Sequence, residues 1–188
     1  MERRQGRLEK QRAAGLIVQV WGPWAVAIDF LVWLAIHIGV SVSVARMPIS
    51  AFKPQSWLYR QRRWEMEGRI YQKVLKIRSW KHRLPDGAAV SKSGFRKKRL
   101  QSSDADYLRT FILETCRAEL THWLIFIFSP IFFLWNDWRI GMVMIVYGIA
   151  ANLPCITSQR FNRIRLQNAQ DRSLAPQLDS VEMSHNDS

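Results

Sequence analysis

The chain has 188 residues, the length of a single domain, and its formal net charge of +13 indicates an anionic partner. Basic segments alternate with long uncharged stretches such as Phe30–Val44, which favours a phospholipid surface over nucleic acid as that partner. The two cysteines, Cys116 and Cys155, exclude a disulfide framework and a cysteine-rich zinc site, and we expect both to be small buried hydrophobes.

The first predicted element is a membrane helix in the apolar run from Leu16 to Ala45, which follows a basic tail at residues 1–15. Gly22-Pro23 is expected to bend or break this helix, because proline cannot continue the backbone hydrogen-bond ladder. Asp29 and His37 are polar residues within the run, and they lie about 80° apart on a helical wheel. We expect both to face protein and to form interhelical hydrogen bonds.

The stretch from Arg46 to Arg117 is basic and is predicted to lie outside the apolar layer. Within it, Trp64–Trp80 is predicted to form a helix in the lipid headgroup region, with its aromatic residues toward the acyl chains. Pro85-Asp86-Gly87 is typical of a turn that ends this helix, and Arg96–Arg99 is expected to be a solvated loop that faces lipid.

A helical hairpin is predicted next, with arms at Leu120–Trp135 and Ile140–Ile156 and a short turn at Asn136–Arg139. Helical spacing is expected to start near Ser103 and Asp106 and to continue into the first arm. Pro130 and Pro154 are expected to kink or end the two arms, which are short for membrane spans. The sequence therefore predicts an all-α integral membrane protein with an N-terminal membrane helix, a basic interfacial helical region and a C-terminal transmembrane hairpin.

Residues 16–166 are predicted to form one membrane domain, and the polar tail at 167–188 is predicted to be disordered. The hairpin places the long basic loop and the C-terminus on one side, which the positive-inside rule makes cytoplasmic. A single N-terminal span then places the basic N-terminus outside, against the same rule, and a re-entrant first segment would remove this conflict.

Polar residues that could perform chemistry gather at the open end of the hairpin, opposite its turn. Glu119 and His122 are three residues apart on one helix face, where a carboxylate can orient an imidazole that acts as a general base. The second arm ends in polar residues that can hold sugar hydroxyls, donor phosphates or a developing oxyanion, namely Asn152, Gln159, Arg160, Asn162 and Arg163. A structural Glu–His pair and a positive-inside anchor are the alternatives.

His82, with Asp86 nearby, is a second candidate base, although a histidine in a basic segment is most often solvated. The four histidines show no ligand spacing, so no metal site is predicted.

At these residues the chain resembles the glycosyl-4,4'-diaponeurosporenoate acyltransferase family of bacterial C30 carotenoid biosynthesis (staphyloxanthin-type pigments). The resemblance covers about Trp64–Leu166, with Phe161 where tyrosine is usual and Ile164 where proline can follow. Three blocks carry it: Trp80-Lys81-His82-Arg83-Leu84-Pro85-Asp86-Gly87, Glu114-Thr115-Cys116-Arg117-Ala118-Glu119-Leu120-Thr121-His122-Trp123, and Ala151-Asn152-Leu153-Pro154 continued by Gln159-Arg160-Phe161-Asn162-Arg163.

The resemblance implies a cell-membrane enzyme that transfers a fatty acyl group to the C6 hydroxyl of the glucose on a glycosylated carotenoid. We expect acyl-CoA as the donor, no permanently bound cofactor, His122 and Glu119 as catalytic residues, and anionic lipids as further partners. Another glycolipid or a polyprenyl glycoside as acceptor, and a non-enzymatic adaptor that binds anionic lipid, remain alternatives. The residues expected to bind substrate are Trp80, Lys81, His82, Asp86, Arg117, Asn152, Gln159, Arg160, Asn162 and Arg163, with Lys81 and His82 forming the opposite wall.

Overall fold

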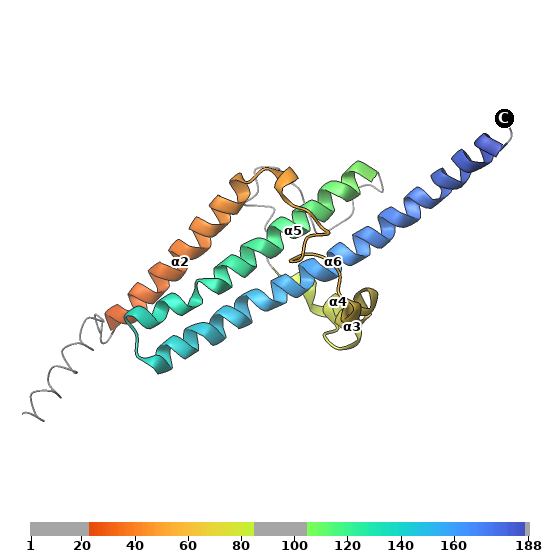
Figure 1. The fold of residues 1–188 in the computed structure, drawn as a ribbon. Helices are drawn as coiled ribbons and strands as arrows, with labels where there is room; N and C mark the ends of the chain where they lie inside the picture. Colours follow the sequence, from red (N-terminus) through yellow and green to blue (C-terminus); the bar gives the residue numbers. More distant parts are fainter. Residues whose placement is uncertain (1–22, 85–104, 187–188) are drawn as a thin grey trace, which may run out of the picture.

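The computed structural model describes the backbone of residues 23–84 and 105–186 and the side chains of most of these residues as far as Arg172. Two long antiparallel helices, α5 and α6, form the centre of the molecule, and α2 packs alongside α5 (Figure 1). The described part consists of helices joined by turns and loops and contains no strand. Its elements are α2 (Pro23–Arg46), η2 (Ile49–Ala51), η3 (Arg63–Gly68), α3 (Arg69–Lys73), α4 (Ile77–Trp80), η4 (Lys81–Arg83), α5 (Ala105–Ile127), η6 (Ser129–Leu134) and α6 (Trp138–Asn186).

Helix α2 is unbroken from its first residue, Pro23, so the proline begins the described helix and does not interrupt it. Its buried face consists of Asp29, Trp33, Val40 and Val44, which recur at the spacing of one helical stripe. The Trp33 ring stacks on Phe132 of η6 at 4.8 Å between centroids. The predicted N-terminal membrane helix is thus confirmed for residues 23–46, and residues 1–22 lie outside the described part.

The Asp29 carboxylate attaches the start of α2 to the hairpin turn. Its Oδ1 accepts hydrogen bonds of 2.8 Å from Trp135 Nε1 and 2.8 Å from Asn136 Nδ2. His37 has a local partner instead, because its Nδ1 lies 2.8 Å from the carbonyl of Trp33 on the same helix. The interhelical hydrogen bond predicted for Asp29 is therefore confirmed.

The predicted hairpin is confirmed, with α5 and η6 as its first arm and α6 as its second. Helix α5 ends at Ile127, and Pro130 lies in the first turn of η6. This confirms the expected effect of Pro130, because proline lacks the backbone N–H that would continue the α-helix. The second arm does not end at Pro154, because α6 continues through it. The proline leaves the Ala150 carbonyl without its helical N–H partner, and a single lost hydrogen bond of this kind is tolerated in a membrane helix that packs against its neighbours.

Helix α6 extends to Asn186, whereas the sequence predicted disorder for 167–188. The start of this extension is held by packing, because Leu166 is buried against Leu108, Phe111 and Ile112 of α5. The polarity of the tail was therefore a poor guide to its backbone structure. The proposed domain boundaries at 16–166 remain a prediction.

The single interfacial helix predicted for Trp64–Trp80 is wrong, since this stretch consists of three short helices. The backbone takes positive φ at Met66 (48°), Glu67 (58°), Gly68 (84°) and Lys76 (46°), which interrupts the helix twice. The first interruption lets the Glu65 side chain turn inward, where it is fully buried. The predicted turn at 85–87 and basic loop at 96–99 lie outside the described residues.

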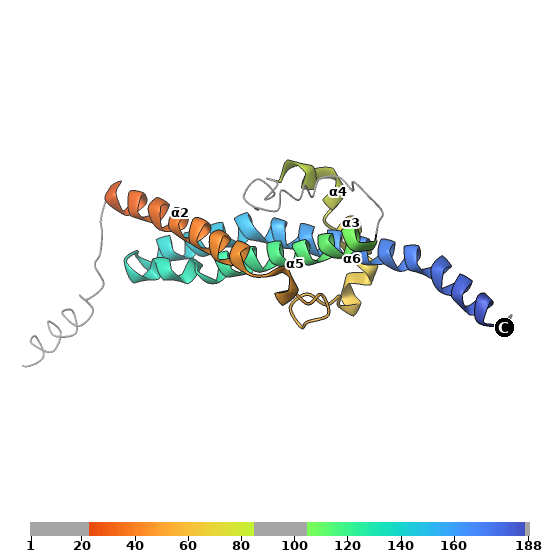
Figure 2. The same cartoon turned by 90° about the horizontal axis from the view of Figure 1, so that it is seen from above.

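The segment between η2 and α4 wraps around the hairpin beyond its apolar part. The loop after α2 lies on one side of α5 and α6, and α4 lies on the other (Figure 2). Tyr71 and Ile77 of this segment pack against Phe161 and Ile164 of α6. This wrapping brings side chains from residues 57–81 to the face of α6 that also meets α5.

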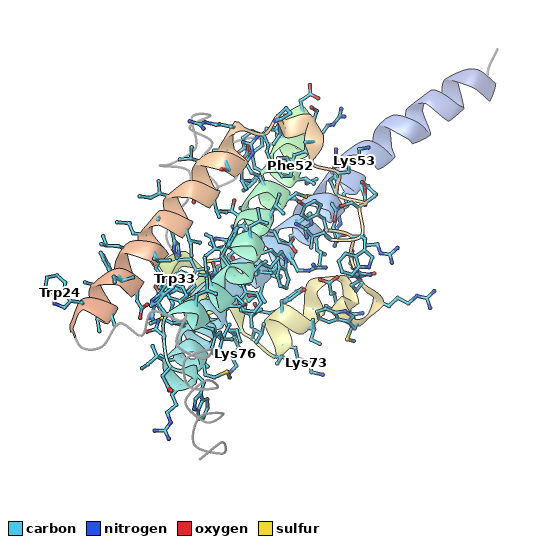
Figure 3. All side chains as sticks on the ribbon, turned by 60° about the vertical axis from the view of Figure 1, so that its left-hand side comes forward. Trp24, Trp33, Phe52, Lys53, Lys73 and Lys76 are labelled. Carbon is cyan, nitrogen blue, oxygen red and sulfur yellow. The ribbon has the colours of Figure 1, made fainter. Side chains whose placement is uncertain are left out.

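Three stretches in the described part are long and apolar enough to cross a membrane: Trp24–Arg46, Asp106–Leu134 and Trp138–Arg172. Many large apolar side chains on them face outward, including Trp24, Phe30, Val143 and Val146. Trp24 projects away from the bundle (Figure 3), whereas the Trp33 ring contacts Phe132 of η6 and Tyr147 of α6. Such an apolar exterior is typical of a helix bundle whose solvent is lipid.

Candidate active site

The Glu119 carboxylate of α5 lies between two arginines of α6. Glu119 is fully buried, its Oε1 accepts a hydrogen bond of 2.9 Å from Arg160 Nη1, and its Oε2 accepts one of 2.5 Å from Arg163 Nη2. Trp123 Nε1 donates a third bond to Oε1 at 3.3 Å. The short hairpin turn therefore does bring Glu119 to the arginines of the second arm, as the sequence predicted.

Arg160 joins α5, α6 and the wrapping segment. Its Nε lies 3.0 Å from Glu65 Oε1, Nη1 also donates to the Leu58 carbonyl at 3.0 Å, and Nη2 donates to the Arg60 carbonyl at 3.2 Å. All three guanidinium nitrogens are thus bonded to protein. Arg160 is built into the structure as a clamp, which leaves it little capacity for the donor phosphates expected from the sequence.

Glu65 completes the clamp from the wrapping segment. Its carboxylate also accepts hydrogen bonds from the Tyr71 hydroxyl and the Arg62 backbone N–H. Burial alone would raise the pKa of Glu65, but the hydrogen bonds from Arg160, Tyr71 and Arg62 outweigh it and hold the pKa below its usual value. Burial and the neighbouring carboxylate raise the pKa of Tyr71, so this hydroxyl remains a donor.

Arg163 occupies the interior of the bundle, where it is only 2% exposed. Its Nη1 lies 3.8 Å from Cys116 Sγ, and its guanidinium stacks over the Tyr59 ring at 5.5 Å. Burial, followed by the nearby Cys116 and Glu119, raises the pKa of Tyr59 to about 12, so the phenol is neutral at physiological pH. Two carboxylates and two arginines, Glu65, Glu119, Arg160 and Arg163, thus form what we call the ion cluster.

His122 lies one turn along α5 from Glu119 and is held by an amide of α6. Its Nδ1 is 3.0 Å from Asn152 Oδ1, while Asn152 Nδ2 donates to the Gly148 carbonyl at 2.9 Å. The Gly148 carbonyl can only accept, so it fixes the amide with its nitrogen toward Gly148 and its oxygen toward His122. That oxygen in turn requires a proton on Nδ1, and the Nε2 of the neutral imidazole then carries the lone pair.

This arrangement gives His122 the tautomer of a general base. Asn152 is 2% exposed and is fixed by its two hydrogen bonds, whereas His122 is only partly buried. A base needs a defined tautomer and access to the proton that it removes, and the pair offers both. The sequence predicted Glu119 as the residue that orients His122. In the structure Asn152 bonds the imidazole directly, and the Glu119 carboxylate forms ion pairs with Arg160 and Arg163.

Lys81 and Asn162 pair with each other farther along α6. Lys81 Nζ donates to Asn162 Oδ1 at 2.8 Å and lies 5.3 Å above the Phe161 ring. Burial, and then the charges of Arg165 and Arg78, lower the pKa of Lys81. Asn162 lies ten residues beyond Asn152, a rise of about 15 Å along the helix, so this pair is not beside His122.

The remaining residues predicted to bind substrate are dispersed. Trp80 packs on the Phe161 cluster and donates to the Leu75 carbonyl at 2.7 Å, and His82 is exposed. Arg117 pairs with Glu114 at 2.7 Å. Gln159 has a buried Oε1 with no hydrogen-bond partner among the described residues, and Asp86 lies outside them.

Sequence reasoning missed Glu65, which lies in the segment that was predicted to form a helix in the lipid headgroup region. Its neighbours, such as Arg62, Arg63 and Arg69, suggest a headgroup surface. The positive φ values at residues 66–68, directly after Glu65, interrupt the helix at this point. Glu65 could have been found only by asking which carboxylate pairs with the arginines of the second arm. Local periodicity does not answer that question.

Comparison with known proteins matches these residues to one family. The family model described as glycosyl-4,4'-diaponeurosporenoate acyltransferase matches residues 54–172. A protein of that name from Staphylococcus haemolyticus (strain JCSC1435) is 34% identical over 142 residues, which cover 72% of this chain and 79% of the relative. Its namesake from Staphylococcus aureus (strain N315) is 31% identical over 134 residues, covering 71% and 81%. No solved structure matches the chain.

Proposed function

The chain belongs to the glycosyl-4,4'-diaponeurosporenoate acyltransferase family and is an acyltransferase, and we propose that it acylates a sugar hydroxyl of a glycosylated carotenoid at a membrane. Family membership excludes the interpretation of the chain as merely an adaptor for anionic lipid. The observation that carries the mechanism is the 3.0 Å contact between His122 Nδ1 and Asn152 Oδ1.

In the proposed reaction His122 Nε2 removes the proton from the sugar hydroxyl as its oxygen attacks the thioester carbonyl of acyl-CoA. A carbon–oxygen bond forms, the carbon–sulfur bond breaks, and the coenzyme A thiolate leaves. The proton on the imidazolium then passes to the leaving sulfur, which returns His122 to its starting state. Asn152 is a positioning residue, because its amide oxygen stabilises the Nδ1–H of both the neutral and the charged imidazole.

The ion cluster holds α5 and α6 in register around this pair. Arg160 and Arg163 clamp Glu119, which precedes His122 by one turn, so they set the height of the imidazole along α6. This role replaces the direct binding of phosphates or an oxyanion by the two arginines. Gln159 is the residue of this region that we propose for the sugar, because its buried amide oxygen can accept a bond from a hydroxyl.

We further propose that the chain is a multi-pass protein of the cell membrane. Three described helices are long and apolar enough to span it. The described residues 47–84, which follow α2, and the end of α6 lie at the same end of the hairpin, and the positive-inside rule assigns this basic end to the cytoplasm (Figure 1). The site would then lie near the cytoplasmic surface, where acyl-CoA is found.

The function is tested by incubating membranes that contain the full chain with acyl-CoA and a glycosylated carotenoid, followed by mass spectrometry of the pigment. We expect an ester on the sugar, and a loss of roughly 10²–10⁴-fold in rate for His122→Ala. His37→Ala is the matched control, because it removes an imidazole from α2 and should leave the rate near normal. Normal turnover of His122→Ala at a normal protein level would remove His122 from the mechanism. If only other glycolipids are acylated, the proposed acceptor is wrong.

A further inference from the structure

A groove of about 780 Å³, lined mostly by polar and charged residues, lies beside the ion cluster. It is bounded by the loop after α2, by the first half of α5 and by the part of α6 beyond Leu166. Phe52 and Lys53 mark its place, between the end of α2 and the far part of α6 (Figure 3). The side chains that matter for binding are Lys53, Arg60, Arg109, Gln167, Asn168 and Asp171.

The groove collects positive charge from separate parts of the chain. Lys53 and Arg60 come from the wrapping segment and Arg109 comes from α5, and Asp171 is the acidic side chain among the described lining residues. Within the residues that the structure describes, no ion pair involves Lys53, Arg60 or Arg109. The three cationic residues outnumber the one acidic residue in this lining, and a concave site with a net positive charge attracts an anion.

The groove shares its wall with the candidate active site. Arg60 is one of the residues that line the groove, and its backbone carbonyl accepts the bond from Arg160 Nη2. Phe52 lies under the Arg117 guanidinium at 5.5 Å, and Arg117 is fixed by the Met47 carbonyl at 3.1 Å. Arg117, which the sequence predicted to touch substrate, thus supports this wall.

We propose that the groove binds the phosphates and nucleotide of coenzyme A, the activating group of the acyl donor. The inference rests on the proposed acyl transfer, because it assigns a place to the donor of that reaction. Arg109 precedes His122 by thirteen residues, a rise of about 20 Å along α5, and the extended pantetheine arm of coenzyme A can bridge such a span. The amides of Gln167 and Asn168 can hydrogen-bond the adenine and the pantetheine.

Coenzyme A fits the groove better than the phosphate of a lipid headgroup does. The groove volume falls in the range of sites that enclose a whole small molecule, about 300–1,000 Å³. A headgroup phosphate would need a cationic surface at the bilayer, and it would leave the amide wall of α6 without a ligand. Phosphate is the shared chemistry, so the experiment must separate the two sources.

The test measures equilibrium binding of coenzyme A, as the free thiol, to the purified full chain in nanodiscs of zwitterionic lipid. Binding should weaken roughly tenfold or more in the Lys53→Gln/Arg109→Gln double variant, because two charge-assisted contacts to phosphate are lost. Coenzyme A that lacks its 3'-phosphate should bind more weakly than coenzyme A to the wild type. That difference should shrink in the double variant.

Lys73→Gln/Arg78→Gln is the matched control, since it removes the same charge from exposed positions on α3 and α4 outside the groove. Lys73 lies away from Phe52 and Lys53 (Figure 3). The control should bind coenzyme A within twofold of the wild type. Equal weakening in both double variants would overturn the proposal in favour of unspecific attraction, and displacement of coenzyme A by nanodiscs rich in anionic lipid would overturn it in favour of headgroups.

Failure of this inference can be distinguished from failure of the proposed function. Acyl transfer that proceeds from a phospholipid donor, with no binding of coenzyme A, would overturn the groove assignment and leave the acyltransferase intact. Binding of coenzyme A that depends on Lys53 and Arg109, in a chain that acylates no glycosylated carotenoid, would support the groove and overturn the proposed acceptor.

Discussion

Glu119 and His122 are one helical turn apart on α5, yet their surroundings differ in kind. Both oxygens of Glu119 are taken up by guanidiniums, and the side chain is fully buried. His122 is partly buried and is oriented through one nitrogen by the Asn152 amide. A group whose hydrogen bonds are all internal stabilises the fold, whereas an oriented group that is only partly buried can meet a substrate. This contrast separates structural from catalytic roles within a single cluster of polar residues.

The largest effect should come from Arg163→Ala, which leaves the Glu119 carboxylate without one of its partners inside the bundle. We expect a loss of about 3–5 kcal/mol of stability, because removing one partner of a buried ion pair is costly. Thermal unfolding in detergent measures it. Arg165→Ala is the control, since Arg165 is exposed on the same helix. Equal melting temperatures for the two variants would show that the ion cluster does not stabilise the fold.

Asn152→Leu should reduce turnover by about 100-fold while the protein remains folded, because the imidazole loses the acceptor that fixes its tautomer. Asn152→Asp keeps an oxygen toward His122 Nδ1 and should retain more activity than Asn152→Leu. Rates of acyl transfer at matched protein level check both variants. If leucine and aspartate prove equally harmful, the acceptor at Nδ1 is not what catalysis requires.

Glu65 connects stability to pH. Its pKa is held below the unfolded value of about 4.3, so it contributes stability above that pH, and this contribution is lost as the pH falls through the folded pKa. Glu65→Gln should therefore lower the melting temperature at pH 7 and flatten the decline of the melting temperature in acid, as the pH falls through the lowered pKa of Glu65. Glu67→Gln, at an exposed position two residues away, should follow the wild type. A wild-type acid profile for Glu65→Gln would contradict this role.

The smallest effect is expected from Gly148→Ala, where α6 packs closely on η6. A Cβ at this position would lie 3.1 Å from Ser129 Cβ, so the helices must separate slightly, at a cost of about 1 kcal/mol. The Gly148 carbonyl also orients Asn152, and activity should fall together with stability. At Gly39 an added Cβ meets nothing within 4 Å, so Gly39→Ala is the control. Identical behaviour of the two variants would show that the close approach is unimportant.

The sequence predicted the helical hairpin because apolar length and a short polar turn leave little choice of topology. The meeting of Glu119 with Arg160 and Arg163 followed from that topology alone. The partners within the cluster could not be predicted, because side-chain geometry decides which carboxylate meets which arginine. Helical spacing assigned Glu119 to His122, and the buried amide of Asn152 was interpreted as a sugar ligand although its oxygen bonds the imidazole.

The wrapping segment was predicted least well. Its basic and aromatic residues suggested one helix in the headgroups, but tertiary contacts of Glu65 and Tyr71 override that local preference. The groove was missed for the same reason, because Lys53, Arg60 and Arg109 become neighbours only once this segment folds over the hairpin. Only a tertiary structure reveals such a meeting of distant charges.

The proposal that Asn152 fixes the tautomer of His122 is tested most directly by nitrogen NMR of the ¹⁵N-histidine-labelled chain. The His122→Ala variant assigns the His122 signals. At neutral pH we expect a His122 ring that carries its proton on Nδ1 and a lone pair on Nε2. In Asn152→Leu the two tautomers should mix. A wild-type His122 protonated on Nε2, with Nδ1 as the acceptor, would contradict the assignment of this residue as the base that Asn152 prepares.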